Sequence, residues 1–263
     1  MKKRITFNRQ YLAAVAVIIC SLALGAATMS AIMHSSVTAE AAPAPLKKTF
    51  NVDYFTDIEV SSGIEVILRQ GEFDGTVTAT SSNAKLNNLD IRVENRKLIV
   101  GLKPNTNARN SSLKVYVTMD KPARISVSSG AEVKVEGALR LDGPLSVIAS
   151  SGAELSFGEI TGTVVKFSAS SGAEIFALLV DTEAINVEAS SGAEVKLRGI
   201  NAAKVDANGA SGAEITLAGR CNFKHVVAKS AAEITTRGLV IENMPIQRYP
   251  DAAEMQQLNY RQP

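Results

Sequence analysis

A six-residue motif returns along this chain at a nearly constant interval, and the interval limits the possible folds more than any other feature. The motif ASSGAE begins at Ala149, Ala169 and Ala189, with close variants before and after. The intervals between its glutamates are 22, 20, 20, 20 and 19 residues. These glutamates are Glu132, Glu154, Glu174, Glu194, Glu214 and Glu233, called the glutamate file below. Such a period is too short for a pair of helices and fits one coil of a β-solenoid.

Apolar and polar residues alternate through each copy of the motif, which is typical of a strand with one buried face. In the copy that ends at Val135, the predicted inward row runs from Ile125 in steps of two. The segments 147–157, 167–177 and 187–197 keep this phase. Stacked coils then bury one continuous core and bond to the coils above and below. The sequence therefore predicts an all-β fold, a single-stranded parallel β-helix (β-solenoid) with coils of about 20 residues.

The small residues of the motif suggest a packing role. We expect the second serine of each copy to face inward in a file of hydroxyls. The following glycine, as at Gly152, marks a position where a side chain is not wanted, because the strand bends or because φ is positive. The sixth copy has Ala231 there, which favours a bend or close packing, since alanine tolerates positive φ poorly. The serines in question are Ser129, Ser151, Ser171, Ser191, Ser211 and Ser230.

Packing does not explain the glutamate file, which the alternation places on the outer face. Carboxylates stacked about 4.8 Å apart repel by roughly 1 kcal/mol in water and by about 3 to 4 kcal/mol at an effective dielectric of 20. Lys134 and Lys196 follow two glutamates on the same face, and Lys166, Arg198 and Lys204 are further candidates to relieve this repulsion. Three interpretations remain open: a solvated acidic ridge, a site for a divalent cation such as calcium, or a surface for a basic or hydroxyl-rich partner.

The N-terminus has the order of an export signal. Residues 1–10 are basic, and an apolar run from Tyr11 to Met33 precedes a polar stretch and a plausible cleavage site at Ala41. The run is also long enough to cross a bilayer. Residues 1–41 are therefore either a cleaved signal peptide or a retained membrane anchor helix. Cleavage would leave only Cys221, which we expect to be buried and which can form no internal disulfide.

The rest of the chain can be divided into segments according to how regularly the repeat recurs. An Ala/Pro-rich linker at 42–49 precedes a β-solenoid at 50–244. Its residues 50–120 alternate less regularly and are expected to form an N-terminal sector that caps the stack, whereas 121–244 carry the regular repeats. Residues 245–263 lose the period and are interpreted as a C-terminal tail.

The segments FTDIEVSSGIEVILRQGE and LDIRVENRKLIVGL, followed by the repeats VSSGAEVKVEG and ASSGAEL, resemble the head-GIN domain family. That family is described as "putative autotransporter adhesin" and comprises exported bacterial proteins similar to single-stranded β-helices. The resemblance covers about Phe50 to Gly238. It implies the fold and an exported location, and it brings no catalytic residues. The chain has no room for a C-terminal membrane barrel after Gly238, which departs from a large autotransporter.

The motifs of common enzyme classes are missing from the sequence. Removal of residues 1–41 would leave His225 as the one histidine, and a single histidine beside Lys224 in a strand is more typical of the surface than of a general base. The chain has no nucleophile elbow, no histidine pair at metal-ligand spacing and no phosphate-binding glycine loop between a strand and a helix. A net charge of +2 without a basic face argues against nucleic acid.

The sequence therefore predicts a non-enzymatic, exported β-solenoid that acts as an adhesin or surface-binding domain through the glutamate file. The alternative is a calcium-dependent β-helix that binds or processes polysaccharides. The expected partner is a surface polymer or protein, and end-to-end or lateral self-association is a further possibility. The expected location is the periplasm or the cell surface, with membrane contact only through an uncleaved N-terminal segment.

Overall fold

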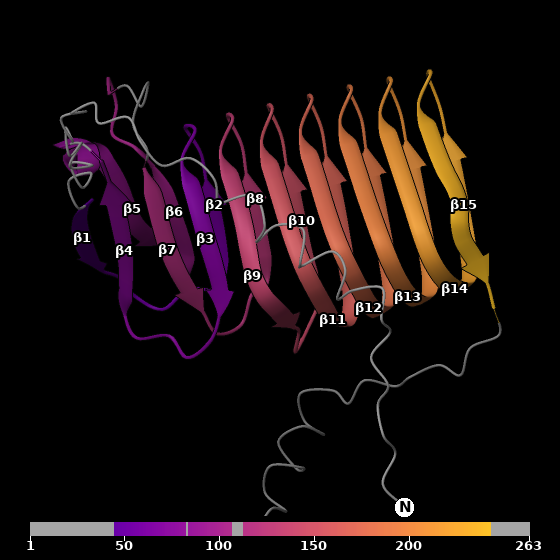
Figure 1. Ribbon diagram of the computed structural model, residues 1–263, viewed down its shortest axis with the longest axis horizontal. Helices are drawn as coiled ribbons and strands as arrows, with labels where there is room; N and C mark the ends of the chain where they lie inside the picture. The colour runs from indigo at the N-terminus through magenta and orange to yellow at the C-terminus, as the bar shows by residue number, and fades with distance from the viewer. Residues whose placement is uncertain (1–44, 83, 107–112, 243–263) are drawn as a thin grey trace, which may run out of the picture. The chain divides into compact units, whose positions relative to one another are not determined.

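The computed structural model describes residues 45–82, 84–106 and 113–242. The predicted signal or anchor at 1–41 and the predicted tail at 245–263 lie outside these residues. The described chain is a β-solenoid, as predicted, with one short 3₁₀ helix, η1 (Ala84–Asn88) (Figure 1). In this part of the chain no helix reaches the length and apolarity that a membrane crossing requires.

The regular coils stack as parallel strands in register. The long strands β11, β12 and β13 have 16 residues each, and four-residue turns join them, which together give the period of 20. Leu155 pairs with Ile175, which pairs with Val195, so equivalent residues form files along the stack. The strands are β8 (Arg124–Val127), β9 (Glu132–Arg140), β10 (Leu145–Ala149), β11 (Glu154–Ala169), β12 (Glu174–Ala189), β13 (Glu194–Gly209), β14 (Glu214–Ala228) and β15 (Glu233–Ile241).

Each long strand bends twice on its way around the coil. In β11 the alternation of buried residues is interrupted at Gly158–Glu159 and again at Thr163–Val164. Neither residue of these pairs is buried, and the inward phase resumes after each pair. One coil therefore consists of three short straight stretches and the turn, with alternate side chains of each stretch inside.

Apolar side chains fill the inside of every coil. Phe157 and Phe167 of β11 meet across the core, with ring centroids 6.3 Å apart in an edge-to-face arrangement. Phe167 is fully buried, and its file continues with Val147 in β10 and Val187 in β12. Burying one such side chain contributes roughly 1.5–3 kcal/mol, so this continuous core is the main source of stability.

The repeated motif forms the turn between two strands, and the expected inward file of serines is wrong. Ser151 and Gly152 are exposed, both have positive φ (55° and 67°), and the Ala153 N–H donates to the Ser150 carbonyl at 3.2 Å. This is a type I′ turn. The inward alternation survives because a turn of four residues restores the period-two phase. The exposed tip serines are Ser129, Ser151, Ser171, Ser191, Ser211 and Ser230.

Positive φ, and not close packing, explains the motif glycine. A Cβ added at Gly152, Gly172 or Gly192 would meet no heavy atom within 4 Å. The left-handed backbone is required instead, and Ala231 adopts it too, with a φ of 62°. The expectation of a bend or close packing is therefore wrong, since alanine occupies the strained conformation directly. The turns also continue the ladder, because Gly152 N–H donates to the Ser171 carbonyl at 3.1 Å.

The opening sector adds antiparallel strands at one end of the stack. Strand β1 pairs with β4, β4 with β7, and β5 with β6, each in antiparallel orientation. The strands are β1 (Leu46–Asn51), β2 (Asp57–Val60), β3 (Glu65–Gln70), β4 (Thr76–Ser81), β5 (Leu89–Glu94), β6 (Lys97–Leu102) and β7 (Lys114–Met119). The coil formed by β2 and β3 is not terminal, because β2 pairs with β6 and β8, and β3 pairs with β7 and β9 (Figure 1).

The other end of the stack is more open within the described residues. There β15 pairs only with β14, and Phe223, Val240 and Ile241 are more than half exposed. An inward position of β14 holds Lys224, whose Nζ lies 3.4 Å from the Thr236 hydroxyl. Charged side chains at inward positions of an edge oppose the addition of further strands.

Candidate binding surfaces

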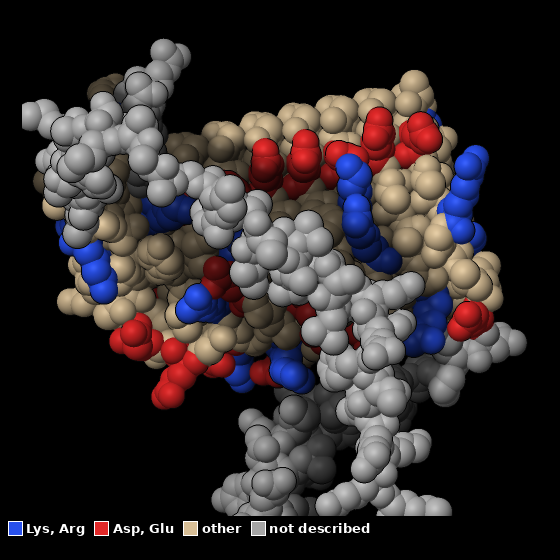
Figure 2. All heavy atoms as spheres, in the orientation of Figure 1, with Lys and Arg blue, Asp and Glu red and all other residues tan. Residues whose placement is uncertain are grey.

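The glutamate file forms a straight row on the outer face. Glu154 pairs with Glu174, and Glu174 with Glu194, in the parallel register of successive strands. The same register adds the remaining members, Glu132, Glu214 and Glu233. Each residue opens its strand directly after a turn, and Figure 2 shows a row of acidic side chains beside the turn edge. Five of the six glutamates are exposed and Glu194 is half-buried.

The file continues into the opening sector, where a lysine ends the acidic row. Glu65 pairs with Glu132 in register, and Lys114 stands opposite Glu65 on β7. Lys114 Nζ donates to Glu65 Oε1 at 2.6 Å, and this hydrogen bond raises the pKa of the Lys114 amine above its ordinary value. The row therefore changes the sign of its charge at one end.

Only part of the predicted charge compensation is present. Lys196 forms an ion pair with Glu194, and that hydrogen bond raises the pKa of the Lys196 amine, with a further contribution from the Glu174 and Glu214 carboxylates. Lys134 forms no ion pair among the described residues. Most of the repulsion along the file is therefore left to solvent and counterions.

Among the described residues, the other three basic candidates form no ion pair with the glutamate file. Lys166 donates to Glu188 Oε1 at 2.8 Å on a different face of the coil. Arg198 lies over the ring of Phe176, 5.6 Å from its centroid. Lys204 pairs in register with Phe223 on β14, in the third stretch of the coil. None of these side chains neutralises a carboxylate of the glutamate file.

A shallow hollow of about 130 Å³ runs beside the glutamate file. Its acidic wall is formed by Glu132, Glu154, Glu174 and Glu194, and its other wall includes Ser156, Phe176 and Lys196. A cationic group placed here meets carboxylates from neighbouring coils. In the residues covered by the structure, no three acidic, histidine or cysteine side chains converge on a point that suits a metal ion.

His225 and Cys221 lie where the sequence places them. His225 is exposed, with Nδ1 3.3 Å from Asp206 Oδ1. Cys221 is buried, and burial raises the pKa of its thiol, which keeps the sulfur protonated and unreactive at neutral pH.

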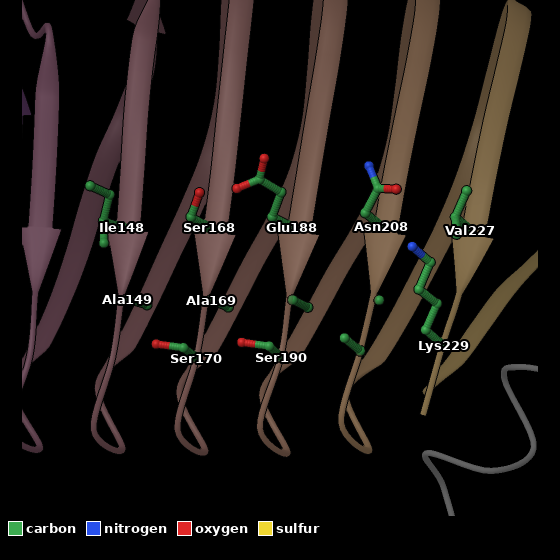
Figure 3. Close-up of a pocket in the computed structure, with 13 residues that line it drawn as sticks. Ile148, Ala149, Ser168, Ala169, Ser170, Glu188, Ser190, Asn208, Val227 and Lys229 are labelled. Carbon is green, nitrogen blue, oxygen red and sulfur yellow. The ribbon is translucent and has the colours of Figure 1, made fainter. Parts of the chain in front are cut away.

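Sequence reasoning missed a second and larger concavity, which we call the coil-end groove. It has a volume of about 380 Å³ and crosses the strand ends that precede the turns, from β10 to β14 (Figure 3). Its polar side chains include Ser168, Glu188 and Asn208 on three successive strands, with Lys229 at one end (Figure 3). No repeat marks these positions, because their residue type changes from coil to coil. The remaining lining residues are Ile148, Ala149, Ala169, Ser170, Ala189, Ser190, Gly209, Ala210 and Val227.

Solved structures share this fold at low sequence identity. A putative lipid binding protein from Parabacteroides distasonis has a TM-score of 0.59 and 11% identity, over 75% of this chain and 97% of that one. A putative adhesin from Bacteroides fragilis has a TM-score of 0.50 and 14% identity, over 76% and 98%. A comparison with curated proteins gave no match. The family model described as "Putative auto-transporter adhesin, head GIN domain" matches residues 54–250, so the chain belongs to this family.

Proposed function

We propose that the protein is an exported, non-enzymatic binding domain that attaches to a basic surface polymer or protein through the glutamate file. The observation that carries this proposal is the in-register row of carboxylates, Glu132 to Glu233, of which only Glu194 has a lysine partner among the described residues. The family description, together with the putative adhesin from Bacteroides fragilis that shares the fold, supports an exported location and a binding role.

A repeated row suits a repetitive partner. Each coil presents one carboxylate at the same place, about 4.8 Å from the next. Isolated contacts between exposed charges contribute little, typically 0.2–1 kcal/mol each. Several such contacts along one polymer act together, because the first contact holds the others at a high effective concentration. The affinity should therefore depend on how many consecutive glutamates are present, and it should fall with added salt.

Charge reversal tests the proposal. The variant Glu154→Lys/Glu174→Lys/Glu194→Lys should lose binding to bacterial cells and to poly-lysine-coated surfaces in a pull-down with the purified chain. A matched control, Glu159→Lys/Glu183→Lys/Glu242→Lys, changes the net charge equally at acidic positions outside the file and should bind like the wild type. If both variants lost binding equally, the loss would be due to the change in net charge and not to the glutamate file. Unaltered binding in the first variant would place the contact on another face.

The calcium-dependent alternative has its own test. If carboxylates of the file held calcium, the melting temperature should rise with calcium and fall with a chelator, because a ligand of the native state stabilises it. We expect no change with either addition. We also expect no release of unsaturated sugars from acidic polysaccharides. A calcium-dependent shift that Glu154→Gln/Glu174→Gln removes would favour the alternative.

A further inference from the structure

We propose that the coil-end groove binds an uncharged, extended polysaccharide. The site is separate from the glutamate file and does not need the file to be functional. The groove crosses five parallel strands, β10 to β14. Strands about 4.8 Å apart give it a length of about 19 Å, enough for a few residues of an extended polymer. Its volume of about 380 Å³ lies within the range of ligand pockets.

The polar groups of the groove differ from strand to strand. Ser168 offers a hydroxyl, Glu188 a carboxylate and Asn208 an amide, and Figure 3 shows the three side by side on neighbouring strands. Ser170 and Ser190 add hydroxyls at the start of the turns. Donors and acceptors are thus mixed along one line, which matches a ligand that carries many hydroxyl groups. A uniform row, like the glutamate file, cannot distinguish one sugar position from the next.

Neighbouring side chains hold two of these groups in place. Lys166 Nζ donates to Glu188 Oε1 at 2.8 Å. Asn208 Nδ2 donates to Asp206 Oδ1 at 3.1 Å, which orients the amide and leaves its oxygen to accept from a ligand. Side chains that are already oriented lose less entropy when a ligand binds.

The charge of the groove favours a neutral ligand. Glu188 and Lys229 are the two charged residues among those that line it, and their charges cancel. An anionic polymer would meet Glu188 near the middle, and a cationic polymer would meet Lys229 at the end. Between the polar groups, Ala169, Ala189 and Gly209 are small and buried, so no large side chain rises from the floor to obstruct a sugar ring.

A peptide cannot bind in the groove as an added β-strand, because the backbone groups at its floor are already hydrogen-bonded between coils. The Ser170 N–H donates to the Ala149 carbonyl at 3.0 Å, and the Ser190 N–H to the Ala169 carbonyl at 3.0 Å. The Lys229 N–H donates to the Gly209 carbonyl at 2.9 Å in the same way. Because coils bond to one another through these groups, the groove presents no free strand edge for β-augmentation. Recognition must therefore use side chains, as in sugar binding.

Calorimetry of the purified chain with neutral hexasaccharides of glucose, mannose and N-acetylglucosamine tests the proposal. At least one of them should bind, and Asn208→Ala and Glu188→Ala should each weaken that binding about three- to tenfold, the effect of one lost hydrogen bond. Filling the groove with Ser170→Leu/Ser190→Leu should abolish binding while the melting temperature stays near that of the wild type.

The glutamate file supplies the control for this experiment. Glu154→Ala/Glu174→Ala should leave oligosaccharide binding unchanged, although it should impair the cell attachment proposed above. Failure of all three sugars to bind, or equal affinity in the Ser170→Leu/Ser190→Leu variant, would overturn the groove proposal and leave the role of the glutamate file untouched. Binding that the Glu154→Ala/Glu174→Ala variant abolishes would also overturn it, since the sugar would then lie on the other face.

Discussion

Two faces of the solenoid flank the turns, and they differ in how constant their outward residues are from coil to coil. After the turn, every regular coil places a glutamate at the same position, from Glu132 to Glu233. Before the turn, the residue at the equivalent outward position changes from each coil to the next. In order along the stack these residues are Ser126, Ile148, Ser168, Glu188, Asn208 and Val227. Both faces belong to one stack with one register, so the backbone does not explain the difference.

The difference separates what the fold requires from what it permits. Neither outward position is needed to fill the core, so both were free to vary. A residue retained six times at one such position produces additive, salt-sensitive attraction along a line. A residue that changes at every coil produces a local and distinctive pattern of hydrogen-bonding groups. One solenoid can thus carry a non-selective surface and a selective one on either side of a single edge.

Truncating a side chain in the core that both faces share should reduce the stability of the protein more than a change in a turn or on either face. Phe167→Ala should lower the free energy of unfolding by about 3–5 kcal/mol, because the ring is fully buried against Phe157. Ser168→Ala, one residue further and on the outside, should change it by less than about 0.5 kcal/mol. Urea unfolding measures both. A loss below 1 kcal/mol for Phe167→Ala would mean that the inward file does not hold the coils together.

Changing the turn should have the next largest effect. Gly172→Val should destabilise the protein by about 2 kcal/mol, because a β-branched residue is strained at the φ of 68° found there. Ala231→Gly should raise stability by about 1 kcal/mol, since Ala231 already occupies the left-handed region. Thermal and urea unfolding of the two variants should therefore shift in opposite directions. Equal signs would contradict the assignment of the turn type.

Neutralising one glutamate on each face should change the stability of the protein in opposite directions. Glu154→Gln removes repulsion from Glu132 and Glu174 and should raise stability by less than about 1 kcal/mol at low salt. Glu188→Gln removes the ion pair with Lys166 and should lower stability by about 0.2–1 kcal/mol. Unfolding at low and high salt checks both, and each effect should shrink as salt increases. A destabilising Glu154→Gln would show that the file is already compensated.

The smallest expected effect is a pH dependence at the lysine within the file. The hydrogen bond to Glu194 raises the pKa of Lys196 above its ordinary 10.5, so the folded state binds this proton more tightly than the unfolded state. The resulting stabilisation is fully present below pH 10.5 and is lost as the pH rises through the raised folded pKa. Lys196→Met should therefore differ from the wild type at neutral pH and approach it at strongly alkaline pH in thermal unfolding. A difference that stays constant with pH would exclude the ion pair as its cause.

The sequence predicted the coil and the glutamate file because both follow from simple periods. Alternation fixes which residues face inward, and the spacing of 20 residues fixes which of them stack. The same alternation misplaced Ser151, because a four-residue turn preserves the phase and therefore looks like continuous strand. Ala231 was interpreted as evidence against a positive φ at this place in the motif. A non-glycine residue with positive φ costs only about 1–2 kcal/mol, which a large stack can tolerate. The dipeptide Ser-Gly between strands was the overlooked sign of a turn.

Features without a period could not be read from the sequence. The coil-end groove depends on Ser168, Glu188 and Asn208 becoming neighbours, and nothing in their spacing marks them as a set. Lys134 and Lys196 occupy the same position in the register of the strands, yet among the described residues only Lys196 forms an ion pair with the glutamate of its own strand. The order of the opening strands could not be predicted either. The pairing of Glu65 with Glu132, which places β3 beside β9, is known only from the register in the structure.

The position of the β2–β3 coil determines where further coils could be inserted into this stack. That coil is held between β6–β7 on one side and β8–β9 on the other, so a duplicated segment inserted there would separate strands that are far apart in the chain. Between β11 and β13, by contrast, each coil offers the same register to both neighbours, and a tandem duplication would be received without rearrangement. A tandem duplication can therefore extend the C-terminal coils, whereas an insertion at the β2–β3 coil would require the opening sector to rearrange.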